Sequence, residues 1–274
     1  VPGGHKFDSP NWVGAYKMSV KNNIAHSRPN VLSNILGNFY SSVQNVRYFR
    51  EFAHSISTDF GLANYQFQCL ICALYQAFYG NLKSRDVIGI GITTNTTPMG
   101  LTKSLGDGSG SVLSYDGDNN AEYPIKLFGF EDLWGRTAEY RSGIRFEVRD
   151  DVRYCIVYPG NVANESAIGR EFIQNDIDNW RIGIKNMKLG EYWDIVPIDD
   201  SGSYNQNMFY CSTAIHEKTG RIFDVGSPSR DYSNLFYVRE SLSVTNAVLG
   251  ARLAFYGEPD EIITGAELVA KIDA

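Results

Sequence analysis

Residues 220–256, GRIFDVGSPSRDYSNLFYVRESLSVTNAVLGARLAFY, combine two kinds of sequence in one stretch. Short apolar and aromatic runs of strand length occur at 236–238 and 253–255. Residues 227–234, here called the polar loop, read Ser-Pro-Ser-Arg-Asp-Tyr-Ser-Asn and have no regular period. Their polar groups would need partners inside a core. The pattern therefore predicts a surface loop held between buried strands, where recognition residues are often found.

The end of this stretch resembles a known family. Leu249-Gly-Ala-Arg-Leu-Ala-Phe255 is similar to the "LG-(F/A)-R-L" close of C-type-lectin-like domains of the formylglycine-generating-enzyme type. The tripeptides at 235–237, 241–243 and 250–252 are similar to the "LFY…S-x-S…GAR" pattern of phage-tail receptor-binding proteins, including tropism determinants diversified by retroelements. The resemblance implies an α+β C-type-lectin-like fold, with two early helices packed on small twisted antiparallel sheets with long loops.

A second stretch, residues 127–144 (LFGFEDLWGRTAEYRSGI), resembles the family signature "GIEN-(L/F)-WGNVWEW-(V/R)-x-GI". The chain departs from it at Arg136 and Thr137, where Asn-Val is usual, and at Tyr140, where Trp is usual. Weaker similarity at 192–200 and 207–212 extends the resemblance, in family order, over nearly the full chain.

Side-chain chemistry gives this second stretch a structural role. Trp134 and Tyr140 are large enough to bury much apolar area. Gly135 and Gly143 allow close approach of two backbones. We expect Glu139 to close polar contacts beneath the loops.

Two helices are predicted early in the chain. Residues 39–57 carry apolar side chains at spacings of three and four, which predicts an amphipathic helix capped by Ser41 or Asn38. Residues 65–79 are nearly apolar all round, which predicts a central helix that ends at Gly80.

The domain organisation is predicted from composition and pattern. The Gly/Pro-rich residues 1–10 read as an arm, residues 11–257 as one C-type-lectin-like domain, and residues 258–274 as an acidic tail. Alternation over 11–20 predicts a strand. Phe7 and Trp12 resemble the family's opening strand, in which an aromatic residue plugs the core.

Composition limits the class of partner. The chain has 274 residues, 43% hydrophobic and 20% charged, which is enough for a large core. Its net charge of −6 offers no basic face for phosphates, so we expect no nucleic-acid partner. No apolar run reaches ~18 residues, so we expect no membrane insertion. No signal peptide is visible after Val1.

The four cysteines predict no metal centre and no disulfide framework. Cys69 and Cys72 lie in an apolar helical pattern without a second pair, which predicts buried free thiols. The family's oxidising enzymes hold copper with two cysteines, whereas Cys211 stands alone near the end of this chain. Cys155 would reach Cys211 only through folding.

The histidines do not indicate a hydrolase. None of the four lies in a G-x-S-x-G or His-x-x-x-His pattern, and they are His5, His26, His54 and His216. We expect His54 to be structural and His216 to lie in a solvated turn. The sequence therefore predicts a protein that is not an enzyme.

One acidic segment has the composition of a calcium loop. Asp116, Asp118 and Asn120 place oxygen side chains at alternate positions, as Ca²⁺ prefers. The segment lacks the glycine and the distant glutamate of an EF-hand loop, so we prefer a solvated loop and expect no metal and no cofactor.

Binding is the function that these residues favour. The surface that we predict combines Tyr and Arg, which often dominate binding energy, with adaptable hydrogen-bonding side chains. It consists of Ser227, Ser229, Arg230, Asp231, Tyr232, Asn234, Tyr237, Arg239 and Ser241. The alternative is an ordinary exposed loop without a ligand.

The resemblance implies receptor binding by a phage tail-tip or fibre protein in the virion tail. The partners would be a host-cell surface receptor, protein or glycan, and other virion tail proteins. A homotrimer would add avidity to weak sites, and a retroelement would diversify residues 226–243. Two alternatives stay open, a bacterial cell-surface adhesin of the same fold and a formylglycine-generating-type oxidase.

Overall fold

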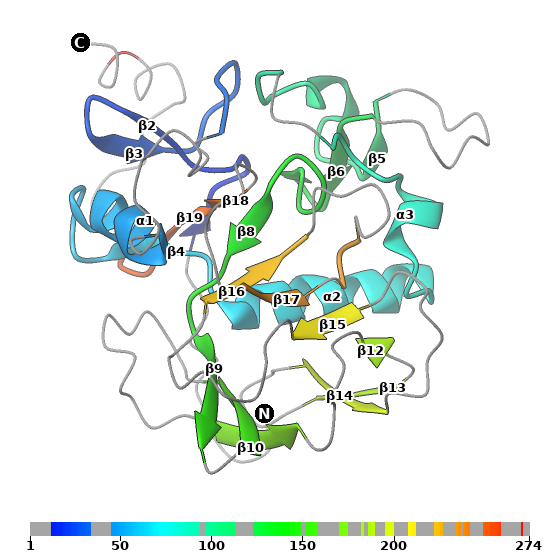
Figure 1. The fold of residues 1–274 in the computed structure, drawn as a ribbon. Coiled ribbons are helices and arrows are strands. Elements are labelled where there is room, and N and C mark those ends of the chain that lie inside the picture. The colour runs from blue at the N-terminus through cyan, green and yellow to red at the C-terminus, as the bar shows by residue number, and fades with distance from the viewer. Residues whose placement is uncertain are drawn as a thin grey trace.

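The structure is a computed structural model in which the helices and the central strands are described. The described residues are 12–33, 45–93, 97–112, 123–149, 152–157, 170–174, 182–183, 186–189, 195–199, 208–211, 222–226, 234–236, 238–241, 249–258 and 270. A few helices and many short strands make an α+β protein (Figure 1).

The first long helix, α1 (Asn45–His54), corresponds to the helix predicted at 39–57 and ends three residues earlier. The proposed caps, Ser41 and Asn38, lie outside the described residues. Phe49 and Ala53 are buried, and the Phe49 ring lies 6.2 Å from the ring of Tyr140. The apolar spacing seen in the sequence therefore faces the core, beside β3 (Ile24–His26) and β4 (Phe60–Leu62).

The second long helix, α2 (Tyr65–Tyr79), has the predicted bounds. The Asn64 side chain accepts a hydrogen bond from the Phe67 amide at 2.9 Å, which satisfies one free amide of the first turn. Gly80 ends the helix in the left-handed conformation, at φ 60°. Both the helix and its C-terminal glycine are thus confirmed.

The environment of α2 differs from the prediction of a wholly central helix. One face is buried through Phe67, Ile71 and Tyr75. Leu70 and Leu74, which do not lie on this face, are 36% and 37% exposed, and Phe78 in the last turn is 72% exposed. The residues that the structure describes bury only part of the surface of this helix, so its apolar residues do not all enter the core. Cys69 and Cys72 are buried free thiols, as predicted.

The predicted strand at 11–20 is two short strands in separate sheets. β1 (Trp12–Val13) pairs with β19 (Leu253–Phe255), which also pairs with β4. β2 (Ser19–Lys21) forms a hairpin with β3, and Asn22 and Asn23 at its turn have φ of 52° and 63°. Trp12 is 51% exposed, so the expectation that it plugs the core is wrong; Val13 packs there instead.

The largest sheet has six strands and contains the ends of both family-like stretches. Its order is β12 (Ile182–Gly183), β15 (Met208–Cys211), β17 (Val238–Ser241), β16 (Ile222–Val225), β8 (Ala138–Tyr140) and β18 (Leu249–Ala251). The pairs β15–β17 and β18–β8 are parallel, so this sheet is mixed, whereas the other described sheets are antiparallel as expected.

Smaller elements surround this sheet. Three more sheets are antiparallel and comprise β9 (Ile144–Arg149) with β10 (Val152–Val157) and β11 (Arg170–Gln174), β13 (Asn186–Leu189) with β14 (Ile195–Asp199), and β5 (Gly110–Ser111) with β6 (Ile125–Leu127) and β7 (Phe130–Glu131). The short helices are α3 (Ser84–Val87) and η2 (Lys103–Leu105). No helix of the described part is long and apolar enough to cross a membrane.

The described residues form two apolar core clusters. One forms around α2 and includes Trp134, Leu235 and Phe236. The other forms between α1 and strands β8 and β18, and includes Phe49 and Tyr140. Residues from both family-like stretches enter the core, because β8 and β18 lie side by side.

Candidate functional site

The two stretches singled out in the sequence meet along β8. Gly250 of β18 lies opposite Glu139 in a parallel pair, and Val225 of β16 lies opposite Glu139 on the other side. Glu139 therefore occupies the middle of a strand with a neighbour on each side. The prediction that Glu139 closes polar contacts can be tested directly at this position.

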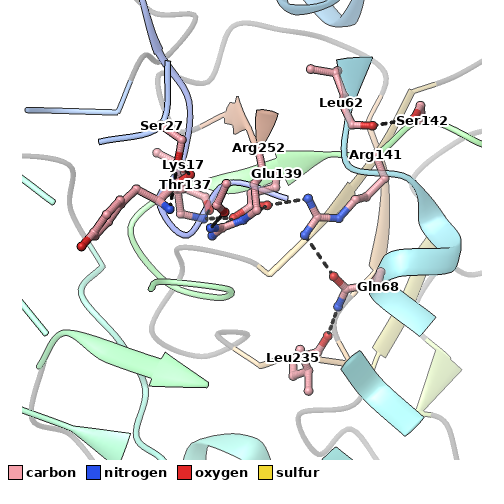
Figure 2. A network of polar contacts seen from close by, with 12 residues as sticks. Lys17, Ser27, Leu62, Gln68, Thr137, Glu139, Arg141, Ser142, Leu235 and Arg252 are labelled. Carbon is pink, nitrogen blue, oxygen red and sulfur yellow. Dashed lines mark hydrogen bonds and ion pairs between the residues drawn. The ribbon is translucent and has the colours of Figure 1, made fainter. Parts of the chain in front are cut away.

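Glu139 is the only carboxylate in a buried group of four charged side chains, here called the Glu139 cluster (Figure 2). Lys17 Nζ lies 2.8 Å from Oε1, Arg252 Nη2 lies 2.7 Å from Oε1, and Arg141 Nη1 lies 2.5 Å from Oε2. All four side chains are fully buried. The prediction for Glu139 is confirmed, and the cluster joins the N-terminal segment to β8 and β18.

The charge balance of the cluster keeps Glu139 ionised. Burial alone would raise the pKa of Glu139, but the charges of Arg141, Arg252 and Lys17 outweigh burial and lower it below its usual range. Burial lowers the pKa of Lys17 to about 8; Glu139 opposes this change and Arg252 adds to it. Because the cluster has three cations and one anion, Lys17 is the cation that loses its charge most readily as the pH rises.

Backbone carbonyls satisfy most of the remaining donors. Arg252 donates to the carbonyls of Gly14 at 2.9 Å, Ala15 at 2.8 Å and Glu131 at 2.7 Å. Lys17 donates to the carbonyl of Thr137 at 2.8 Å. A buried ion group is tolerable only when such donors are paired, so the cluster fixes the backbone around it.

Close backbone approach is required within residues 127–144, as the glycines predicted. Gly135 has φ 77°, and a Cβ there would lie 2.7 Å from the Ile92 carbonyl oxygen. Gly143 also has a left-handed φ of 79°. The neighbouring Asp132 and Arg136 are left-handed as well and form a buried ion pair. Burial raises the pKa of Asp132, and the charge of Arg136 opposes this rise.

The polar loop connects two strands that pair with each other. Val225 at the end of β16 lies opposite Val238 at the start of β17. Gly226, directly before the polar loop, has φ 68°, and a Cβ there would lie 2.3 Å from the Leu133 carbonyl oxygen. The entry to the loop therefore packs backbone against backbone on the 127–144 stretch.

The last residue of the polar loop is buried, which corrects one predicted binding residue. Asn234 is fully buried, and its Oδ1 accepts hydrogen bonds from Ser84 Oγ at 2.5 Å and from the Phe236 amide at 3.3 Å. Leu235 and Phe236 follow it into the core, where the rings of Phe236 and Tyr75 lie 5.8 Å apart. Asn234 thus fixes the end of the loop and does not face a ligand.

The remaining predicted binding residues have no described side chain. Ser227, Ser229, Arg230, Asp231, Tyr232 and Tyr237 lie outside the described residues. Arg239 and Ser241 lie in β17, where backbone pairing places Arg239 opposite Asp224 and Ser241 opposite Ile222. The structure therefore describes the frame on both sides of the predicted surface, and the surface itself stays a prediction.

The calcium-like segment of the sequence is not described either. Asp116, Asp118 and Asn120 lie outside the described residues, and the residues that the structure describes contain no group of three or more metal-binding side chains. Cys155 and Cys211 lie in β10 and β15, strands of different sheets. No arrangement for nucleophilic or metal chemistry is thus found among the residues that the structure describes.

An apolar hollow of about 290 Å³ lies between the β2–β3 hairpin and the β1–β19–β4 sheet. Its lining includes Trp12, Ile24, Ile56, Phe60 and Phe255. Ser27 also lines it, but its hydroxyl is already bonded to the Tyr16 backbone. The walls of the hollow are therefore mainly apolar; His26 and Ser27 are its polar side chains, and its lining contains no carboxylate.

Sequence reasoning missed the buried polar residues that hold this frame. Lys17 lies in a segment of strand-like alternation where it would be assigned to the polar face, so no signal revealed its burial. Gln68 did carry a signal, because helical spacing places it on the same face of α2 as Cys72 and Tyr75. A polar residue on an apolar face indicates a specific partner.

No protein-family model matches this chain, and no curated protein is significantly similar to it. The resemblance to C-type-lectin-like domains therefore rests on the quoted motifs. Two of those motifs contribute adjacent parallel strands, β8 and β18; Glu139 lies in β8, and Arg252, its partner in the Glu139 cluster, directly follows β18.

Proposed function

We propose that the chain is a C-type-lectin-like domain that binds a host-cell receptor as a phage tail-tip or fibre protein. The observation that carries this proposal is the way in which both ends of the polar loop are fixed. Gly226 packs against the backbone of residues 133–134, and Asn234 is buried against Ser84. Fixed ends reduce the entropy that a loop loses on binding.

The chemistry of the loop suits a polar receptor. Arg230, Tyr232 and Tyr237 supply a cation and two phenols, and the serines between them adapt their hydrogen bonds. Both proteins and glycans present the hydroxyls, carbonyls and carboxylates that such groups recognise. Asn234 is left out of this surface because its side chain is buried.

Assembly is part of the same proposal. The resemblance to phage tail proteins supports a homotrimer attached to other virion tail proteins, in which several weak sites act together. The activity proposed is binding alone, without a cofactor. The surface polar loop, and not the apolar hollow beside Trp12, is the proposed contact.

The experiment replaces Arg230, Tyr232 and Tyr237 together by alanine. We expect binding to susceptible cells from a panel of bacterial strains to fall by about 100-fold or more, since residues of these types often dominate binding energy. Thermal unfolding should shift by less than about 2 °C, because surface substitutions cost little stability.

The matched control carries three alanines at exposed positions outside the frame of the polar loop, Lys21, Lys103 and Asp107. It should bind like the wild type. Full binding by the triple variant at 230, 232 and 237 would refute the proposed surface.

A further inference from the structure

Gln68 of α2 is a buried amide that is bonded on both sides. It is 1% exposed, and its Oε1 accepts a hydrogen bond from Arg141 Nη2 at 3.1 Å. Its Nε2 donates to the Leu235 carbonyl at 2.8 Å. Figure 2 shows Gln68 between the guanidinium of Arg141 and the backbone of Leu235. The side chain therefore connects the Glu139 cluster to the end of the polar loop.

The backbone amide and carbonyl of Leu235 bond to side chains, and not to the backbone of a neighbouring strand as they would in a sheet. Its carbonyl accepts from Gln68, and its amide donates to Ser84 Oγ at 2.9 Å. The same hydroxyl donates to Asn234 Oδ1 at 2.5 Å. Residues from α2 and α3, remote in sequence, thus fix the two residues at which the chain leaves the polar loop.

A purely apolar side chain would fill the place of Gln68 at lower desolvation cost. The neighbours of Gln68 include Cys72 and the Phe67 ring, over which Arg141 lies at 5.6 Å. A buried amide costs free energy unless both of its ends are paired. The two bonds at fixed distances therefore give a precise spacing between Arg141 and Leu235 that packing alone would not specify.

We infer that Gln68 is a positioning residue for receptor binding. Its two hydrogen bonds hold the Leu235 carbonyl at a fixed distance from Arg141 of the Glu139 cluster, and thereby fix the end of the polar loop. This inference rests on the proposed function of that loop. Its consequence is that affinity depends on a buried side chain that does not touch the receptor, because a loop with a loose end must be ordered when it binds.

Two substitutions separate the two bonds of Gln68. Gln68→Glu keeps an acceptor for Arg141 and adds a negative charge to a cluster with more cations than anions, but it cannot donate to the Leu235 carbonyl. Gln68→Met has a similar size and loses both bonds, which leaves Arg141 Nη2 without a partner. Both variants lack the bond to the loop, and only Gln68→Met also lacks the bond to the cluster.

We expect the two variants to differ in stability and to agree in binding. Gln68→Met should unfold at lower temperature than Gln68→Glu. Each should bind susceptible cells about tenfold more weakly than the wild type at equal folded fraction, as expected when a buried carbonyl loses its donor. Hydrogen exchange of the amides at 227–235 should be faster in both variants while the protein remains folded.

Gln76→Glu, an exposed position on the same helix, is the control for added charge and should change neither binding nor exchange. Binding that follows stability, with Gln68→Glu like the wild type, would overturn the inference and leave Gln68 a structural residue. Unchanged loop exchange in both variants would overturn it as well. Faster exchange in both variants, with no binding even by the wild type, would refute the receptor-binding proposal and leave the positioning of the loop end supported.

Discussion

Glu139 gives Lys17, Arg141 and Arg252 a common counter-charge in a site that excludes water. Its position on β8 makes it a neighbour of both β16 and β18. Three cations without this carboxylate would repel one another at full burial. The stability of the whole frame therefore depends on one ionised side chain.

Glu139→Gln should lower the free energy of unfolding by about 3–5 kcal/mol, the range for removing one partner of a buried ion pair. Denaturant titration followed by circular dichroism measures the change. The control Glu258→Gln, at an exposed position, should stay within about 0.5 kcal/mol of the wild type. A loss for Glu139→Gln no larger than that of the control would contradict the role of the cluster.

Lys17 makes stability depend on pH in the alkaline range. Its folded pKa of about 8 lies below the ordinary value of 10.5, so between these values the unfolded chain binds more protons than the folded one. The contribution of Lys17 to stability should therefore rise with pH in this window, by about 1 kcal/mol per pH unit near pH 9. Cys72 contributes in the opposite direction, because burial raises the pKa of its thiol from 9.0 to about 12.

Denaturant titrations of the wild type and of Lys17→Met between about pH 8 and 9.5 isolate this contribution, because ionisation of thiols and tyrosines is common to both proteins. The stability of the wild type relative to Lys17→Met should rise by about 1 kcal/mol per pH unit near pH 9. A difference that does not change with pH would show that Lys17 does not titrate in this window.

At the scale of elements, the position of the polar loop depends on the residues that follow β16 and precede β17. Gly226 ends β16 against the Leu133 carbonyl, and Asn234 begins the return to β17 against Ser84. Each contact joins the loop to a different part of the fold. The start of the loop requires glycine at position 226, because a side chain there would clash with Leu133, and its end requires the hydrogen-bonding side chain of Asn234.

Gly226→Ala should cost more than about 2 kcal/mol of stability, since its Cβ would meet the Leu133 oxygen at 2.3 Å and its φ is 68°. Gly129→Ala is the matched control, because Gly129 has φ 83° but nothing within 4 Å of its Cβ. It should cost only about 1 kcal/mol, the backbone contribution alone. Equal losses, measured by thermal unfolding, would mean that the Leu133 contact yields without strain.

Local patterns in the sequence predicted some elements well. The helix at 65–79 and its end at Gly80 follow from apolar content and one glycine, both local properties. The role of Glu139 was predicted from its motif. Lys17 and Ser84 carry no comparable signal, because their partners lie more than a hundred residues away in the sequence.

Two errors show where local reasoning fails. Asn234 continues a polar run, so it was assigned to the surface, yet its Oδ1 meets Ser84 in the core. Trp12 was assigned to the core by its resemblance to the family's opening strand, yet it lines the apolar hollow and is half-exposed. Composition does not distinguish a buried polar group with partners from an exposed one.

At the scale of the whole molecule, the N-terminal segment, the two family-like stretches and the helices converge on one polar network. Arg252 bonds to carbonyls at residues 14, 15 and 131, and Gln68 continues the network to Leu235. We expect a frame held at this many points to tolerate substitutions in the polar loop at little cost in stability. This separation of frame and surface is what receptor binding by the loop would use.

Hydrogen–deuterium exchange of the full chain, alone and bound to envelopes of susceptible cells, tests the central claim most directly. The account predicts slower exchange at residues 227–240 on binding and no change along the outer face of α2. Protection confined to α2 or to the hollow beside Trp12, with residues 227–240 exchanging as in the free protein, would contradict it.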